Sequence, residues 1–580
     1  MSLRICFVTP FPWPQPHDVN EHVRGVSEAL RRRGHAVTVI APSTRAADLL
    51  QGRRALQRRE LGELVAIGAA VPTSFTDRVA LPVGVRANLA AALAIGRFDV
   101  VHGVEPGLPS LSFAALLEAE TLTAATFLSP ERLTLARKSQ RAKLLARVDA
   151  LVATSAAAAA AAARQLPGDF TVIAAGVDAS RYAPGPKRNL IVVETGTAQN
   201  AIGRAVLRAL RELPGWELAL ARTSPLALRP TIPPAVRERA HVRSVVKPDA
   251  RRALLGEAAL FIPLPGGSER LRLEAEASGC AIVDPPGLLE QPELAAAALA
   301  RFVDDDDLRR RAGIDARARA EGATFDVVAA RLEQVYRSVA ARRRPSRPAV
   351  VDPLAARDTI VVDLHMHTRW SHDCSIEPLA LIEHAESEGL GAIAVTDHNV
   401  FGGAQETVAL AKDRDLIVIP GEEVKTDEQG EVIGLFLHSE IPRGMTFAET
   451  VAAIREQEGI VFVPHPFDRM HAIPSPATLH RHLHEIDVLE VYNARLLFET
   501  YNDEALRFQR KYGLLAGAGS DAHVLQGVGT GAVRMRRFDG PEEFLLSLRT
   551  AEVVRRPKSR AYLQSLKWVA QVKERISAVD

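Results

Sequence analysis

The segment VVDLHMH, from Val361 to His367, joins an apolar run to two histidines and decides the fold class of the C-terminal part. Six further runs of this kind follow it: AIAVTDH from Ala392, LIVIPGEE from Leu416, VIGLFLH from Val432, IVFVPHP from Ile460, VLEVYN from Val488 and LLAGAGSDAH from Leu514. Continuous Val/Ile/Leu runs bounded by Gly, Pro and charge are typical of strands buried on both faces, and the segments between them have helical spacing. The alternation predicts a βα barrel of seven strands.

Most of these runs end in side chains that bind metals. In a βα barrel the functional groups lie at the carboxyl ends of the strands, where several ends converge on one point. His365 and His367 alternate with Met366, so both imidazoles face the same side and can share one ion. Imidazole and carboxylate together suit Zn, Mn or Fe, and we expect two or three such ions. The ligand-type residues at the strand ends are His365, His367, Asp397, His398, Glu423, His465, Asp521 and His523.

The composition limits the remaining possibilities. A chain of 580 residues exceeds what one core organises, so two to four domains are expected. Lys and Arg number 72 against 70 Asp and Glu, a balance that gives no electrostatic case for a nucleic-acid partner. The three scattered cysteines indicate neither a disulfide framework nor a cysteine zinc site. Neither a signal peptide nor a run long enough to span a bilayer is recognisable, so we expect a cytoplasmic protein.

One boundary interrupts the chain between Ala340 and Asp358, where the sequence reads AARRRPSRPAVVDPLAARD. Prolines and clustered arginines break all periodicity there, as in an exposed linker. Upstream, strand-like runs such as RICFVTP and LIVVETG alternate with amphipathic helices, which predicts two doubly wound parallel sheets. The expected domains are residues 1–175, residues 176–342, a linker over 343–357, and residues 358–580.

The upstream region resembles the retaining GT-B glycosyltransferases that include sucrose and mannosyl transferases. The segments that carry the resemblance are EHVRGVSEALRRRGHAVTVIAP from Glu21, FDVVHG from Phe98, VIAAGVDASRYAPG from Val172, LEAEASGCAIV from Leu273 and FDVVAARLEQVY from Phe325. The match covers roughly residues 1 to 340. It implies two Rossmann-like halves with a nucleotide-sugar cleft between them.

The same resemblance exposes departures in the donor site. The family has a Gly-Gly turn after its first strand, where this chain has Asp18-Val19-Asn20, and it has an Arg and a Lys in the loop that here reads TAQNAIG, Thr197 to Gly203. Of its two paired glutamates, Glu274 matches the second, whereas the first falls on Gly266. Each lost charge-assisted phosphate contact removes about 1.5–3 kcal/mol. We therefore expect a degenerate module in which Glu274 is a remnant of the donor site.

The downstream motifs HMHT, SHD, TDHN, PGEE, PHPFDR and GSDAH, in this order and spacing, resemble the PHP domain of the polymerase and histidinol phosphatase superfamily. The resemblance runs from Asp358 to about Val554 and implies a distorted seven-stranded barrel. It implies that His365, His367, Glu423 and Asp521 hold one metal, that Glu423 bridges to a second bound by His465, and that His398 and His523 hold a third with Asp373 or, alternatively, His372.

Residues next to these motifs have other expected roles. Many PHP domains have a histidine after the acid of the fourth strand, where this chain reads Glu431-Val432-Ile433; His438 either replaces it or faces solvent. Asp363 is expected to position its strand rather than to bind metal, and Glu422 to point away from the site.

Two arginines are candidates for binding a phosphate, because a guanidinium presents a planar fork to phosphate oxygens: Arg469, four residues after His465, and Arg495 in YNAR. Both also suit salt bridges at the rim. His480, His482 and His484 are expected on a solvated face. The basic C-terminal stretch RRPKSRAYLQSLKWVAQVKER is expected to form a helix that packs on its own domain.

Together these observations predict a metal-dependent phosphoesterase, in which a metal-activated hydroxide attacks a small-molecule phosphate ester and Asp397 or His398 handles protons. A sugar phosphate or a nucleotide is the candidate substrate. Two alternatives stay open: an active GT-B glycosyltransferase with a PHP accessory domain, and a non-catalytic metal-binding scaffold.

Overall fold

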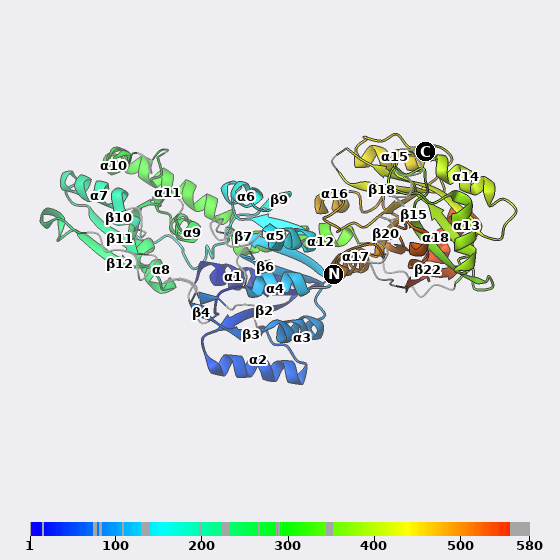
Figure 1. The fold of residues 1–580 in the computed structure, drawn as a ribbon. Helices are drawn as coiled ribbons and strands as arrows, with labels where there is room; N and C mark the ends of the chain where they lie inside the picture. Colours follow the sequence, from blue (N-terminus) through cyan, green and yellow to red (C-terminus); the bar gives the residue numbers. More distant parts are fainter. Residues whose placement is uncertain are drawn as a thin grey trace. The chain divides into compact units, whose positions relative to one another are not determined.

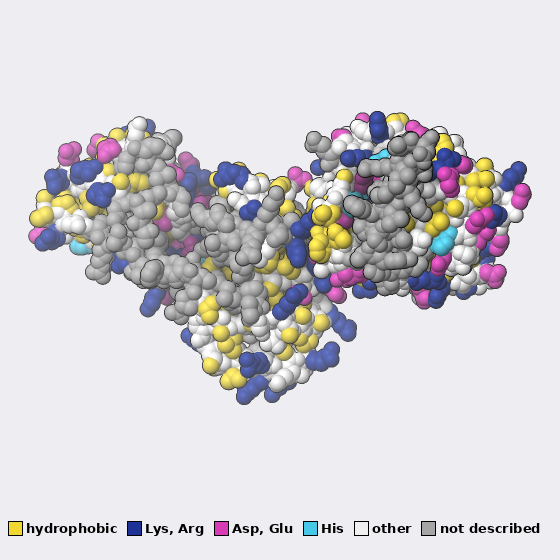
Figure 2. Space-filling model, viewed as in Figure 1, with side chains coloured by type: hydrophobic (Ala, Val, Ile, Leu, Met, Phe, Trp, Pro, Cys, Tyr) yellow, Lys and Arg dark blue, Asp and Glu magenta, His cyan; other side chains and the backbone are white. Residues whose placement is uncertain are grey.

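The computed structural model divides the chain into two compact units, Met1–Val339 (unit 1) and Ala340–Asp580 (unit 2). It describes residues 2–13, 15, 17–72, 78–79, 84–106, 110–128, 138–195, 200–222, 231–264, 267–285, 287, 291, 293–343, 352–427 and 429–556. The basic C-terminal stretch therefore lies almost wholly outside the described residues. On the visible face of unit 2, side chains of both charge signs are intermixed (Figure 2).

The first half of unit 1 is a parallel seven-stranded sheet in the order β3-β2-β1-β6-β7-β8-β9 (Figure 1). Its strands are β1 (Arg4–Val8), β2 (Ala36–Ser43), β3 (Leu64–Ala69), β6 (Val100–Val104), β7 (Leu122–Phe127), β8 (Ala150–Ala153) and β9 (Phe170–Val172). Its helices are α1 (Asp18–Arg32), α2 (Ala46–Arg58), α3 (Arg86–Gly96), α4 (Leu111–Glu118), α5 (Lys138–Arg147) and α6 (Ala156–Ala163). The short strands β4 (Val71–Pro72) and β5 (Arg78–Val79) form a separate pair.

The second half of unit 1 is a parallel sheet in the order β12-β11-β10-β13-β14. Its strands are β10 (Arg188–Thr195), β11 (Glu217–Arg222), β12 (Ala240–Ser244), β13 (Ala258–Ile262) and β14 (Ala281–Ile282), and its helices are α7 (Asn200–Ala209), α8 (Pro248–Glu257), α9 (Glu269–Ala277), α10 (Leu294–Asp304), α11 (Asp306–Glu321) and α12 (Phe325–Ala341). Helix α12 returns to the first half, where the Tyr336 hydroxyl lies 2.6 Å from His102 Nδ1 in the buried core. Two Rossmann-like halves closed by such a returning helix make a GT-B fold.

Unit 2 contains a nine-stranded sheet in the order β21-β20-β19-β18-β17-β16-β15-β22-β23. Its strands are β15 (Thr359–Met366), β16 (Ala392–Val395), β17 (Ile417–Lys425), β18 (Glu431–Leu435), β19 (Ile460–Val463), β20 (Val488–Asn493), β21 (Leu515–Gly519), β22 (Gly531–Arg536) and β23 (Glu552–Arg555). Its helices are α13 (Pro378–Ser387), α14 (Gly402–Leu410), α15 (Phe447–Glu456), α16 (Pro476–Arg481), α17 (Glu499–Tyr512) and α18 (Gly540–Leu548). The seven expected strands are β15 to β21.

The sheet of unit 2 curls into a nearly closed barrel because the end of β21 returns to β15. Asp521 N donates to His365 O over 2.8 Å, and His367 N donates to Ala522 O over 3.2 Å. One strand departs from the parallel pattern, since β18 runs antiparallel to both β17 and β19. Strands β22 and β23 extend the sheet beyond the seven expected strands, with β22 antiparallel to β15.

The described part of the expected linker packs on unit 2 instead of standing in solvent. Leu354 is 7% exposed, and Arg357 pairs with Asp539 over 2.8 Å and with Glu543 over 2.7 Å. Within the described residues, no helix has both the length and the apolar character required to cross a bilayer.

Candidate metal centre

Glu423, on β17, lies at the centre of the candidate site in unit 2. Its Oε2 lies 3.2 Å from His365 Nε2 and 3.1 Å from His398 Nδ1. The same oxygen is 3.5 Å from His367 Nε2, and Oε1 lies 3.1 Å from His465 Nε2. The carboxylate is 1% exposed. A buried carboxylate that faces four imidazoles can bridge two ions.

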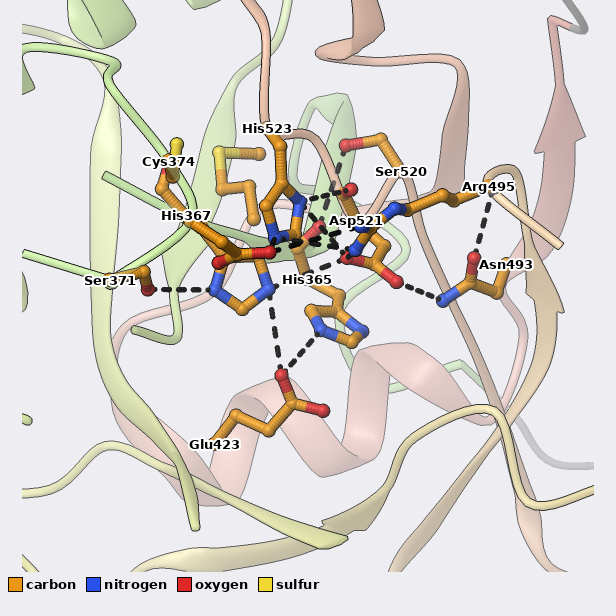
Figure 3. A network of polar contacts seen from close by, with 12 residues as sticks. His365, His367, Ser371, Cys374, Glu423, Asn493, Arg495, Ser520, Asp521 and His523 are labelled. Carbon is orange, nitrogen blue, oxygen red and sulfur yellow. Dashed lines mark hydrogen bonds and ion pairs between the residues drawn. The ribbon is translucent and has the colours of Figure 1, made fainter. Parts of the chain in front are cut away.

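His365 and His367 leave the end of β15 toward this carboxylate, as Figure 3 shows. The Nδ1 atom of His367 lies 3.2 Å from the Ser371 hydroxyl, which orients the ring. Its Nε2 is buried between Glu423 and Asp521, 3.5 Å from an oxygen of each, and has no hydrogen-bond partner among the described residues. A buried polar atom without a partner is costly, so this nitrogen is placed as a metal ligand would be.

A third cluster forms around Asp373, in the loop after β15. Asp373 Oδ2 lies 3.0 Å from His523 Nε2, and its Oδ1 lies 3.8 Å from His398 Nε2. His372 is exposed, and its ring centroid is 5.6 Å from that of His398. Of the two residues that the motif SHD offered, the geometry favours Asp373.

Among the described residues, four overlapping sets of three residues could each hold a metal ion, because the ligand atoms within each set lie within 4.8 Å of one another. They are His365 with His367 and Asp521; His365 with Glu423 and His465; His367 with His398 and His523; and His398 with Glu423 and Glu431. Neutral imidazoles mixed with carboxylates are the donors that Zn, Mn and Fe share, so the residues present fit divalent transition-metal ions.

Glu490, on β20, is a positioning residue that the sequence analysis missed. Its Oε1 lies 3.1 Å from His365 Nδ1, on the side of the ring opposite Glu423, and its Oε2 accepts the His465 N–H over 2.6 Å. Asn493 Nδ2 donates to the same Oε2 over 3.1 Å. A carboxylate on the second ring nitrogen fixes the tautomer of a ligating histidine. The signal was a charged residue inside VLEVYN, a run otherwise buried on both faces.

Two aspartates fasten the loops that carry the ligands. Asp363 accepts Ser520 N and Gly529 N, each over 2.9 Å, and so ties β15 to the exit of β21. Asp397 accepts Thr368 N over 2.7 Å, and its other oxygen accepts the Thr368 hydroxyl over 2.6 Å. This geometry favours a positioning role for Asp397, and the proton transfer expected of it stays a prediction.

Two ligand-type residues adopt a backbone conformation that non-glycine residues rarely take. His465 has φ 26° and Asp521 has φ 52°. Such conformations cost roughly 1–3 kcal/mol each and persist only where surrounding contacts hold them. The Asp521 amide is held by His365 O, and Asp521 Oδ1 accepts Arg495 Nη1 over 3.0 Å.

Burial and neighbouring charged groups together set the pKa values of the ligand-type residues. Burial would raise the pKa of Glu423, but His365 and His398 hold it well below its usual range. Burial would lower the pKa of His365, but Glu423 and Glu490 raise it well above its usual range. For His367, burial and the nearby His523 and His398 lower the pKa well below its ordinary value. An ionised Glu423 and a neutral His367 are the forms that bind metal.

Family models match the two units separately. The Glycosyltransferase Family 4 model matches residues 19–181, the PHP domain model matches residues 363–510, and the PHP-associated model matches residues 499–553. The chain carries a PHP domain behind a glycosyltransferase family 4 region. The PHP match contains Glu423 and the four histidines around it, and the PHP-associated match contains Asp521 and His523.

Known proteins are similar to parts of the chain. An uncharacterized protein of Methanocaldococcus jannaschii is 33% identical over 207 residues, which are 33% of this chain and 82% of that protein. A phosphatidyl-myo-inositol mannosyltransferase of Propionibacterium freudenreichii is 33% identical over 187 residues, 31% of this chain and 48% of that protein. A sucrose-phosphate synthase structure from Thermosynechococcus elongatus has a TM-score of 0.42 at 15% identity and covers 58% of this chain and 99% of that one.

Glu431 is the acid of the fourth strand of the PHP domain, two residues before Ile433, where many PHP domains have a histidine. Its Oε2 lies 3.8 Å from His465 Nε2, and it completes the set with His398 and Glu423. His438 is exposed and belongs to none of the sets found among the described residues. The geometry therefore favours Glu431 over His438 as the additional ligand.

The two candidate phosphate-binding arginines occupy different surroundings. Arg495 reaches the cluster, where Nη1 lies 3.0 Å from Asp521 Oδ1 and Nη2 lies 3.9 Å from Asp373 Oδ2. The Arg495 side chain as a whole is 31% exposed. Arg469 is exposed on the loop after His465. Arg495 is thus the arginine that the structure brings to the clusters, whereas a role for Arg469 stays a prediction.

His480, His482, His484 and Glu422 belong to none of the ligand sets found among the described residues. His480 bonds the Tyr512 hydroxyl over 3.0 Å, and His482 pairs with Glu485. His484 is exposed, but only His480 of the three is on helix α16, which ends at Arg481. Glu422 is buried and accepts Ile441 N over 2.8 Å, and burial raises its pKa to about 7.

In unit 1, Glu274 lines a cleft of about 1160 Å³. Arg251 donates to both of its oxygens, with Nε 2.6 Å and Nη2 3.1 Å away, and Glu274 is 3% exposed. Arg251 Nη2 also donates to Glu21 over 2.8 Å, and Arg270 pairs with Asp18 and Glu21. The loop from Thr197 to Gly203 has no Arg or Lys, but helices α8 and α9 supply Arg251 and Arg270 to this part of unit 1. Residues 197–199 and Gly266, on which two of the donor-site departures rest, lie outside the described residues.

Proposed function

We propose that the PHP domain is a metal-dependent phosphoesterase that hydrolyses a phosphate ester of a small molecule. The observation that carries this proposal is the buried Glu423 carboxylate with four imidazole nitrogens within 3.5 Å. A purely structural cluster would pair such atoms by hydrogen bonds, whereas His367 Nε2 has none among the described residues.

The proposed ions are two or three of Zn, Mn or Fe. His365, His367, Glu423 and Asp521 would hold one, Glu423 would share a second with His465, and His398, His523 and Asp373 would hold a third. When bound, such ions supply an activated hydroxide and neutralise the charge that develops on the phosphoryl oxygens.

The side chains around the ions have separate proposed tasks. Arg495 would orient the phosphoryl group, because its partly exposed side chain lies beside Asp521 and Asp373. His398 is 18% exposed, and its Nε2 faces Asp373. It would exchange protons at this nitrogen if only two ions bind, because a third ion would occupy the same nitrogen. Asp397 would hold the Thr368 amide and so keep the loop after β15 in place.

We further propose that the family 4 region does not transfer sugar from a nucleotide donor. Glu274, the residue expected to hold the donor, already accepts two hydrogen bonds from the buried Arg251. The region could instead recognise a glycan, which would make the substrate of the PHP domain a sugar phosphate; a nucleotide is the other candidate. The buried thiols of Cys6 and Cys280 suit a reducing compartment, and we propose a cytoplasmic location.

A second candidate is an active glycosyltransferase with a PHP accessory domain. The similarity to phosphatidyl-myo-inositol mannosyltransferases, at 33% identity over 187 residues, favours it. A radiolabelled transfer assay with common nucleotide sugars separates the two, since transfer by the full chain would establish the second candidate.

The first proposal is tested by a phosphatase screen over nucleotides, sugar phosphates and bisphosphates with Zn, Mn or Fe supplied. We expect turnover that a chelator abolishes and that the chosen ion restores. Turnover that survives in both Asp521→Ala and His367→Ala, prepared beside His482→Ala as a control, would refute the proposed site.

A further inference from the structure

The second sheet of unit 1 has its topological switch point beside β10. The chain runs from β10 to β11 and β12 on one side and then crosses to β13 on the other. In open α/β sheets, ligands bind in the crevice at the carboxyl ends of the strands at such a point. The loop after β13 leads into helix α9, whose N-terminal amides favour an anionic group. The cleft of about 1160 Å³ opens here, and Leu264, Ser268 and Glu194 line it.

A carboxylate of the chain itself occupies this position. Glu194, near the end of β10, accepts the backbone N–H of Ser268 over 2.9 Å with one oxygen and that of Leu264 over 3.1 Å with the other. The side chain is 3% exposed. A Cβ at Gly267 would lie only 2.4 Å from Glu194 Oε2, so the backbone at Gly267 packs directly against the carboxylate.

We propose that Glu194 is a built-in anion that fills the phosphate cradle of the family 4 cleft and thereby excludes nucleoside diphosphates. The inference rests on the proposal that this region does not use nucleotide-sugar donors, and it names the residue responsible. Two backbone N–H groups that would otherwise bind phosphoryl oxygens are already satisfied, and a second anion beside Glu194 would meet like-charge repulsion.

A second carboxylate, from the first half of unit 1, adds to the exclusion of nucleoside diphosphates. Asp18, in the first turn of α1, accepts the hydroxyl of Ser268, the N-cap residue of α9, over 3.0 Å. Arg270 in the first turn of α9 pairs with Asp18 and with Glu21. The charge of Arg270 is therefore already neutralised by the protein.

The protonation of Glu194 sets the pH for the test. Burial raises its pKa to about 7, and the charge of Asp18 adds to the increase, against the two backbone hydrogen bonds and Arg270. At pH 8 the side chain is a carboxylate, so the exclusion is tested in its ionised form.

The experiment is calorimetric titration of the full chain at pH 8 with methylene-bridged analogues of uridine and guanosine diphosphate, which a phosphoesterase cannot cleave at the bridge. Each titration is repeated with the additional change His367→Ala, which removes a proposed metal ligand of the PHP domain, so that binding that survives it is assigned to unit 1. Glu194→Gly and Glu194→Ala should each gain one additional site, at least about tenfold tighter than any binding to that cleft in the wild type. Glu194→Gln, which keeps the shape, and Glu28→Gln, an exposed carboxylate lining the same cleft, should not gain it.

The proposal is overturned if the wild type binds the analogues in unit 1 as tightly as Glu194→Gly, or if folded Glu194→Gly and Glu194→Ala both gain no site. Circular dichroism and the melting curve identify folded variants, and the wild-type titration remains decisive if neither variant folds. Phosphatase activity, measured in parallel, reports on the PHP proposal independently. A wild type without phosphatase activity would contradict the PHP proposal and leave the assignment of Glu194 unaffected.

Discussion

Replacing Glu490 by Gln perturbs the metal centre without removing a metal ligand. In the folded protein the carboxylate serves His365 Nδ1, the His465 N–H and the Asn493 amide over 2.6 to 3.1 Å. An amide has one acceptor oxygen, so its NH₂ group must face at least one of these donors. The ring of His365 then loses the partner that fixes its orientation.

The expected magnitude follows from these contacts. Leaving one buried donor unsatisfied costs about 1–3 kcal/mol. Loss of the partner that orients a ligating histidine lowers metal affinity by roughly 10- to 100-fold. Because a tenfold change in affinity corresponds to about 1.4 kcal/mol, the expected loss of metal affinity and the cost of the unsatisfied donor are of the same size.

Metal affinity is measured by competition with a chromogenic chelator, and turnover by phosphate release at increasing metal concentration. Glu490→Gln should bind metal 10- to 100-fold more weakly than wild type and recover most turnover at saturating metal. Glu422→Gln is the matched control, since Glu422 is equally buried but accepts the Ile441 amide. Unchanged affinity in Glu490→Gln, or an equal loss in both variants, would refute the reasoning.

Three further predictions follow from the same contacts. Asp521→Ala and His367→Ala should each lower turnover by more than about 100-fold while His482→Ala stays near wild type, as steady-state kinetics will show; equal losses would mean that the site is misplaced. Glu431→Ala should weaken the binding of one ion and leave the others, measured by elemental analysis against a chelator series; unchanged stoichiometry and affinity would exclude Glu431 as a ligand. Because folding raises the pKa of Glu194 from 4.5 to about 7, the unfolding free energy of the wild type relative to Glu194→Gln should fall by about 2.5 kcal/mol from pH 5 to pH 8 in denaturant titrations of the full chain; a flat difference would argue against the buried carboxyl.

The strand ends were predictable because apolar runs and ligand-type residues coincide in sequence. The run that ends in His365 and His367 and the run that ends in Asp521 both became strands of the barrel, β15 and β21. Strand direction was not predictable in the same way. Strand β18 is antiparallel to its neighbours, and hydrophobic periodicity carries no information on direction.

Contacts between distant segments account for what the sequence did not reveal about the two sites. Glu490 is 125 residues from His365, and nothing local to VLEVYN shows that its carboxylate meets that ring. The partners of Glu194 lie 70 and 74 residues further along the chain. In each case the sequence shows a charged residue inside an apolar strand, but only the folded structure shows which groups that residue contacts.

The most direct test of the central claim is elemental analysis of the full chain after metal-supplemented expression, with phosphate release measured on the same preparation. We predict at least two transition-metal ions per chain, and turnover that falls in proportion as a chelator removes them. Less than one ion per chain, or turnover that is indifferent to the metal content, would contradict the account.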